Sequence, residues 1–214
     1  MESTLTIKET IVESLNESLR LARVGIEYKK SKENGILWKQ PEGILGFPVT
    51  ILLCSITDAI GSYILGSKKS YEIIGDKDFY DFKDINDSNK ANYAEMLYTQ
   101  YRNPLIHNQI IREQYRLDTR NSDIKSLFIL NKENGLTVYY LQVNDLFDAS
   151  IKAVENFSKR IDTFVKEDSP IIKNSSAKLK KNYISNPEIS DTKPTKGMSA
   201  CCDDAGLYNV QRFK

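Results

Sequence analysis

The sequence predicts a mostly α-helical protein, a bundle of helices into which one β-hairpin is inserted. The first observation behind this prediction is that apolar residues recur at helical spacing over most of the chain. The second is a single stretch, residues 126–143, in which β-branched and aromatic runs flank the turn dipeptide Asn134-Gly135. A later shift to Lys, Asn, Ser and Pro predicts a helical domain over residues 1–168 and a polar, flexible tail over residues 169–214.

Two long helices are expected first. Apolar residues on one helical face predict a helix over about residues 4–30, and a Gly- and Pro-rich loop follows it. A second helix is expected over about residues 48–65, and because it is apolar on most sides it belongs in the middle of the bundle. An aspartate near the centre of a membrane span costs about 2.5 to 3.5 kcal/mol, so Asp58 favours a buried helix over a membrane span.

Asp58 is the charged residue in this otherwise apolar helix, and its environment is left open by the sequence. A buried carboxylate needs a partner, so Asp58 caps another helix or pairs with an arginine, for which Arg102 is a candidate. The alternative is that Asp58 points to solvent at the edge of the helix.

The remaining elements follow from periodicity and from turn residues. A short helix is expected over residues 79–85, and another helix runs through Tyr93 and Tyr101 to a break at Arg102-Asn103-Pro104. The next expected elements are a helix over residues 104–116, the hairpin strands 126–130 and 136–143, and a last helix that Asn144 or Asp145 caps and that reaches Val165.

The amino-acid composition excludes some classes of function. Lys and Arg number 30 against 29 Asp and Glu, so the net charge of +1 lacks the basic excess of proteins that hold long nucleic acids by charge. Cys54 lies in an apolar run and is expected to be a buried small hydrophobe, while Cys201 and Cys202 lack a partner set for zinc. With no secretory signal at the N-terminus, these features predict a reduced, cytoplasmic setting, without a cofactor or metal.

The single histidine, His107, marks the candidate site. It lies five positions after Arg102 and four after Asn103. Histidine titrates near neutrality and serves as a general acid or base, and arginine offers a planar fork of donors to phosphate oxygens. Pro104 predicts that Asn103 caps a helix with His107 on the same face, where the helix N-terminus suits a phosphate. The alternative is an ordinary helical histidine beside an ordinary surface arginine.

These residues resemble the HEPN superfamily, whose motif is an arginine, four to six residues, and a histidine, often with a polar residue directly after the arginine. The stretch from Arg102 to His107 matches the shortest spacing, with Asn103 as the polar residue. The segment Thr57-Asp58-Ala59-Ile60-Gly61 and the Leu97-Tyr98 that leads into the motif resemble uncharacterised bacterial HEPN-like proteins. The resemblance covers residues 1–167, and the hairpin departs from a minimal HEPN bundle.

The resemblance implies a HEPN-like antiparallel helical bundle and metal-independent RNA cleavage of the toxin or host-defence kind. It equally admits a relative that binds RNA, a nucleotide or a protein partner without catalysis. It implies a homodimer, and as partners a cognate antitoxin or a nucleotidyltransferase. The site residues it carries over are Arg102 and His107 as catalytic residues, with Asn103, Asp58 and Tyr98 in support.

RNA cleavage by 2′-hydroxyl attack needs a base, an acid and a partner for the phosphorane charge. A neutral His107 suits the role of base or acid, and Arg102 suits the phosphorane. One imidazole cannot act at both ends of the scissile bond in a single step. The second role therefore falls to water, to Tyr98 or Tyr101, or to His107 of a second subunit across a two-fold axis. A third class of function is purely structural, with Arg102 paired to Asp58 and His107 idle.

Overall fold

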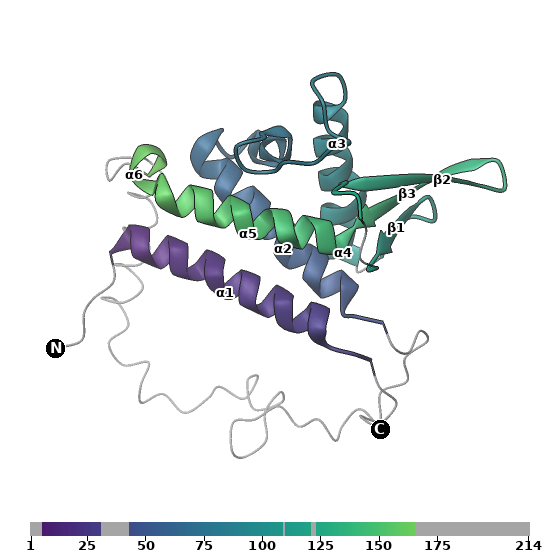
Figure 1. The fold of residues 1–214 in the computed structure, drawn as a ribbon, viewed down its shortest axis with the longest axis horizontal. Coiled ribbons are helices and arrows are strands. Elements are labelled where there is room, and N and C mark those ends of the chain that lie inside the picture. Colours follow the sequence, from purple (N-terminus) through teal and green to yellow (C-terminus); the bar gives the residue numbers. More distant parts are fainter. Residues whose placement is uncertain (1–5, 31–42, 109, 121–122, 166–214) are drawn as a thin grey trace, which may run out of the picture. The chain divides into compact units, whose positions relative to one another are not determined.

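The computed structural model describes residues 6–30, 43–108, 110–120 and 123–165. These residues belong to one compact unit, Met1–Val165, and the predicted tail over residues 169–214 lies outside the described residues. The described chain is mostly helical and carries one small mixed sheet (Figure 1). The coarse class predicted from periodicity, a helical protein, is therefore confirmed.

The first helix, α1, spans Ile7–Glu27, within the predicted range. Its start is set by a capping box, because the Thr6 hydroxyl accepts the Glu9 N–H and the Glu9 carboxylate accepts the Thr6 N–H at 2.7 Å. Only one narrow stripe of α1 is buried, which includes Leu15, Ala22 and Gly25. This helix therefore covers the core from one side and leaves its charged side chains in solvent.

Three long helices pack against one another, namely α1, α2 over Gly46–Ile64 and α5 over Val143–Lys159 (Figure 1). The end of α1 meets the start of α2, since a Cβ on Gly25 would lie 2.5 Å from Val49. The start of α1 meets the residues that follow α5, where Lys8 Nζ lies 2.6 Å from Asp162. Both neighbours of α1 therefore run antiparallel to it.

The middle position predicted for the apolar second helix is confirmed. Helix α2 buries residues along its whole length, and they are Gly46, Val49, Thr50, Leu53, Cys54, Ile56, Thr57, Ile60 and Gly61. Within the described ranges, α2 is the helix that is long and apolar enough to cross a membrane by length and composition alone, a test that core helices of soluble proteins also pass.

The predicted hairpin is confirmed, and the sheet is larger than predicted. Strands β2, Phe128–Glu133, and β3, Leu136–Gln142, pair antiparallel around Asn134 and Gly135, whose φ angles are 49° and 81°. Positive φ at both central residues is what a type I′ hairpin turn requires. A further strand, β1 over Tyr115–Asp118, pairs parallel to β3, so the order is β1-β3-β2.

The predicted helix over residues 104–116 is wrong beyond its first part, because α4 spans Asn103–Asn108 and β1 begins at Tyr115. The ring of Tyr115 stacks on Tyr139 of β3 with centroids 5.7 Å apart. It also meets Tyr101 edge-on at 5.7 Å. These cross-strand and helix contacts are distant in sequence, and they override the weak helical pattern of this segment.

The predicted short helix over residues 79–85 is also wrong. A 3₁₀ helix, η2, spans Ser70–Gly75, and turns follow it up to α3 at Lys90–Met96. Aspartate and asparagine side chains bond the backbone here, as when Asp76 accepts the Asp78 N–H at 2.9 Å. Asp84 accepts two backbone N–H groups at the start of β2, from Leu127 at 2.8 Å and from Phe128 at 3.0 Å. Such bonds compete with helix formation.

The last predicted helix exists, although neither predicted residue caps it. Gln142 is the N-cap of α5, and Asn144 and Asp145 lie in its first turn. The carboxylate of Asp145 accepts the backbone N–H of Ser126 at 3.1 Å, which ties the helix to the start of the hairpin. A break at Arg160 separates α5 from the short helix α6, Ile161–Phe164.

Candidate functional site

The motif lies within one continuous helical stretch and does not begin a new helix. After α3 the chain forms a π-helical segment, η3 over Leu97–Arg102, and passes directly into α4. Asn103 has φ −65° and ψ −48°, a helical conformation, and its N–H donates to the carbonyl of Tyr98. The predicted break, the Asn103 N-cap and the free helix N-terminus for phosphate are therefore wrong.

The π-helical segment explains how the helix passes through Pro104. A proline inside an α-helix lacks an N–H and its ring clashes with the carbonyl four residues earlier. In η3 the bond from Asn103 to Tyr98 spans five residues, so the helix is widened just before the proline. The widened turn accommodates the ring.

Arg102 is held by three neighbours. Its Nε atom is shielded from solvent and lies 3.0 Å from Oδ2 of Asp58 on α2, an ion pair in which the Nε–H is not aligned for a hydrogen bond. Its Nη1 donates to Oδ1 of Asn103 at 2.9 Å. The guanidinium carbon lies 4.9 Å from the ring centroid of Tyr98, a cation–π contact. The side chain remains 26% exposed, and within the described ranges no acceptor bonds Nη2.

Of the two environments considered for Asp58, the pairing with Arg102 is confirmed. The second oxygen of Asp58 accepts a hydrogen bond from the Ser70 hydroxyl at 3.2 Å, and the carboxylate is 19% exposed. Burial raises the pKa of Asp58 above its ordinary value, against the lowering effects of Arg102 and Ser70. The ion pair therefore orients the Arg102 side chain, although burial of the Asp58 carboxylate costs free energy.

His107 is exposed on α4 and is not part of this cluster of contacts. Five residues along an α-helix correspond to a rotation of about 140°, so the backbone positions of Arg102 and His107 lie on different sides of the helix. Four residues correspond to about 40°, so His107 shares the face of Asn103, as predicted. The structure thus brings together Asp58, Tyr98, Arg102 and Asn103, and it leaves the imidazole on the adjacent surface.

The two tyrosines considered for proton transfer have different environments. Tyr101 is fully buried, and its hydroxyl donates to the carbonyl of Tyr139 at 2.7 Å. Burial raises the pKa of Tyr101 far above its ordinary value, which removes it as an acid or base for a surface substrate. Tyr98 is half-buried and lies beside Arg102, so of the two it is the one with access to a bound phosphate.

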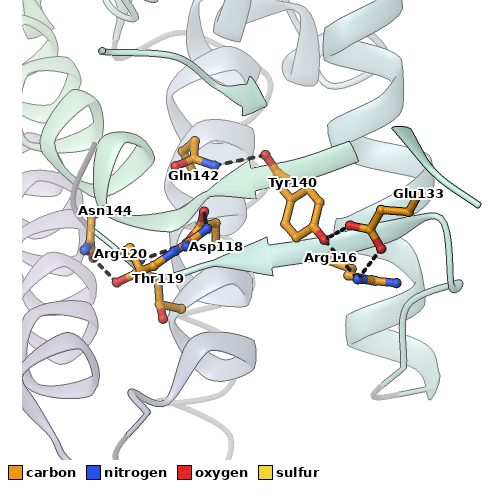
Figure 2. Close-up of polar contacts among 8 residues, drawn as sticks. All are labelled: Arg116, Asp118, Thr119, Arg120, Glu133, Tyr140, Gln142 and Asn144. Carbon is orange, nitrogen blue, oxygen red and sulfur yellow. Dashed lines mark hydrogen bonds and ion pairs between the residues drawn. The ribbon is translucent and has the colours of Figure 1, made fainter. Parts of the chain in front are cut away.

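A second polar cluster lies on the sheet and was not predicted (Figure 2). Nη1 of Arg116 lies 2.9 Å from both Glu133 Oε2 and the Tyr140 hydroxyl, and this hydroxyl donates to the other oxygen of Glu133. Arg116 on β1, Tyr140 on β3 and Glu133 on β2 therefore bridge all three strands. Their charges are matched within the cluster, which gives it a structural role.

The other half of this cluster ties β1 to α5 (Figure 2). Asp118 accepts from Nε and Nη2 of Arg120 at 3.0 and 2.8 Å, and hydrogen bonds from Arg120 lower the pKa of Asp118. The side-chain amide of Asn144 donates to the carbonyl of Thr119 at 3.0 Å. Charged residues stand at every second position, at Arg116, Asp118 and Arg120, and this period of two indicates a strand that was not predicted.

In the described residues, neither the surface grooves nor the Cys54 thiol forms a competing reactive centre, while Cys201 and Cys202 lie outside the described residues. Two grooves of about 530 and 780 Å³ run along α1 and α5, and neither is lined by Arg102 or His107. Cys54 is buried, as predicted, and burial raises its pKa to about 12, so its thiol is not a nucleophile. In the part of the chain that the structure describes, no three His, Cys, Asp or Glu side chains are placed to hold a metal ion.

Comparisons with known proteins identify no family for this chain. No protein-family model, curated protein or solved structure matches this chain. The resemblance to the HEPN superfamily therefore stays a prediction from the motif.

Proposed function

We propose that this protein is a metal-independent endoribonuclease of HEPN type, with Arg102 as the phosphate anchor and His107 as the proton-transfer group. One observation carries the proposal, namely the way in which Arg102 is held. Asp58 and Asn103 engage its Nε and Nη1, Tyr98 covers one face, and Nη2 bonds no described residue. A preorientated guanidinium with an unused donor edge is suited to the charge of a phosphorane.

The proposed chemistry uses the RNA's own 2′-hydroxyl as nucleophile. A base removes its proton, the 2′-oxygen bonds to phosphorus, and the bond from phosphorus to the 5′-oxygen breaks as an acid protonates that oxygen. The products are a 2′,3′-cyclic phosphate and a 5′-hydroxyl. Arg102 stabilises the extra negative charge on the phosphorane, and His107 supplies one of the two proton transfers.

A dimer is part of this proposal. His107 lies outside the cluster of contacts around Arg102, and one imidazole cannot act at both ends of the scissile bond, so the proposal includes a second subunit. A two-fold axis beside α4 brings His107 of one subunit towards Arg102 of the other and supplies a second imidazole. An antitoxin or a nucleotidyltransferase remains the kind of macromolecular partner that the resemblance implies.

The position of His107 outside the contacts around Arg102 favours a second candidate function, an RNA-binding module that does not cleave RNA. In that function Arg102 binds a phosphate, and His107 contacts a different part of the RNA. Both candidates require RNA to bind at Arg102, so binding and cleavage have to be measured separately.

The test incubates the pure full-length protein with a mixed RNA pool, with and without EDTA, and maps the ends of the products. Cleavage should persist in EDTA and leave cyclic phosphates. His107→Ala and Arg102→Ala should each lower the rate by about 10² to 10⁴. The double variant should be scarcely slower than either single variant, because the two groups act in one step.

Arg160→Ala is the matched control. Like Arg102, Arg160 pairs with an aspartate, at 3.1 Å from Asp78, and lies over aromatic rings, those of Phe79 and Phe164. It shares no partner with Arg102, so its loss should leave cleavage unchanged. Cleavage that persists in His107→Ala, or that vanishes with EDTA, overturns the nuclease. RNA binding without cleavage in the wild type selects the binding module.

A further inference from the structure

A closed ring of side-chain contacts surrounds Arg102 and extends beyond the motif. Tyr98, which the guanidinium covers, has a second aromatic neighbour in Tyr71 of η2, with ring centroids 5.0 Å apart and planes inclined by 33°. Ser70, the residue before Tyr71, donates to Asp58 at 3.2 Å, and Asp58 returns to Arg102 at 3.0 Å. The stack Arg102–Tyr98–Tyr71 is thus fixed at both ends.

The backbone of α2 holds Tyr71 in this stack. A Cβ on Gly61 would lie 1.8 Å from the carbonyl oxygen of Ser70, so the two backbones are in direct contact. This contact places η2 against α2, and it aims Tyr71 at Tyr98 without requiring Tyr71 to enter the core.

Tyr71 and Tyr98 also differ from the core tyrosines of this protein. Tyr80 and Tyr101 are fully buried, and each hydroxyl is bonded, with Tyr80 3.0 Å from Thr57 and Tyr101 2.7 Å from Tyr139. The rings of Tyr71 and Tyr98 are half-buried, and neither hydroxyl bonds another residue of the described ranges. Accessible, mutually oriented rings beside a cation are typical of stacking surfaces for nucleobases.

We propose that Tyr71 and Tyr98 form a stacking platform for an unpaired nucleobase of the strand whose phosphate Arg102 binds. The base extends the stack at its Tyr71 end, while the free Nη2 edge of Arg102 takes the phosphate. The site therefore accepts single-stranded RNA and rejects duplex RNA, whose bases are already stacked on their neighbours. This inference rests on the proposed function, because it requires RNA at Arg102.

The experiment measures the affinity of full-length protein carrying His107→Ala, so that no RNA is cleaved. The probes are a labelled single-stranded oligoribonucleotide, the same strand with abasic nucleotides, and its duplex. Tyr71→Leu removes the ring and should weaken binding of the single strand about 5- to 150-fold, whereas Tyr71→Phe keeps the ring and should not. Tyr63→Leu is the control, since Tyr63 is half-buried against Phe157, at 5.7 Å, away from the stack.

If Tyr71→Leu fails to fold, the affinities of the protein with Tyr71 intact for the abasic strand and for the duplex still test the platform. With Tyr71 intact, the abasic strand should bind about 5- to 150-fold more weakly than the intact single strand, and the duplex should bind weakly too. Equal affinity for single strand, abasic strand and duplex overturns the platform. If cleavage depends on Arg102 and His107 while Tyr71→Leu binds normally, the nuclease stands and the platform is wrong. If Tyr71 governs binding and no cleavage is seen, the platform stands and the nuclease is wrong.

Discussion

At the scale of single residues, the site is defined by how Arg102 is oriented. Its charge is matched by Asp58, yet burial raises the pKa of that carboxyl despite the ion pair. Charged groups that are retained at such a cost are typical of functional sites. Arg102 provides both a positive charge and a planar set of hydrogen-bond donors, and substitutions can test these two properties separately.

Arg102→Lys should preserve the fold and abolish the proposed function. A lysine ammonium can still pair with Asp58, but it is a point charge and cannot engage Asn103 and a phosphate with separate donors in one plane. We expect the cleavage rate to fall by about 10² to 10³ while the thermal unfolding midpoint stays close to that of the wild type. Cleavage at the wild-type rate would show that charge alone is sufficient.

Asp58→Asn should change the pH dependence of stability. Because burial raises the folded-state pKa of Asp58 above the ordinary value of 3.8, its protonated form stabilises the fold. That contribution is fully present below the unfolded pKa and is lost as the pH rises through the folded pKa.

Urea denaturation from acid to neutral pH measures this effect of Asp58. The free energy of unfolding of the wild type minus that of Asp58→Asn should fall as the pH rises, and it should then level off. A difference that grows with pH would mean that attraction to Arg102 outweighs burial.

At the scale of secondary-structure elements, the close approach of α2 to η2 positions the site. The contact between Gly61 and Ser70 leaves no space for a side chain, and Ser70 and Tyr71 both depend on it. The π-helical segment η3 is the matching feature on the other side, because it carries both Tyr98 and Arg102. The stack of Arg102, Tyr98 and Tyr71 therefore forms only if η2 and η3 keep their positions relative to each other.

Gly61→Ala should destabilise the fold and disturb the site together. Its Cβ would lie 1.8 Å from a backbone oxygen, so backbone has to move, which costs about 1 to 3 kcal/mol or more. Gly46→Ala is the control in the same helix, because its Cβ would meet only side-chain atoms, at 3.4 Å or more. Urea denaturation should show a lower free energy of unfolding for Gly61→Ala and little change for Gly46→Ala.

At the scale of the whole molecule, the single histidine makes the oligomeric state decisive. Tyr101, one of the alternatives for the second proton transfer, is sequestered under the sheet. The remaining sources of the second proton-transfer group are Tyr98, water and a second subunit.

Light scattering at micromolar concentration should give about twice the chain mass of 24.5 kDa. Mixed dimers of Arg102→Ala and His107→Ala chains should recover part of the activity, because one composite site would keep both groups. A strictly monomeric protein that still cleaves RNA would assign the second transfer to Tyr98 or water.

The features with local causes were predictable from the residues alone. Helical periodicity located α1, α2 and α5, and Asn134-Gly135 located the hairpin turn through its positive φ angles. The buried position of Cys54 also followed from its apolar surroundings. In each case a few neighbouring residues carry the preference, so no distant partner is needed to express it.

The features that depend on distant partners became apparent only from the packing of the folded chain. Strand β1 forms because Tyr115 packs on Tyr139 and Tyr101, and the helix continues through Asn103 and Pro104 because η3 is widened. The pairing of Asp58 with Arg102 and the stack on Tyr71 likewise join residues from separate elements. Local propensity is weak in such segments, so packing free energy between distant residues sets their conformation.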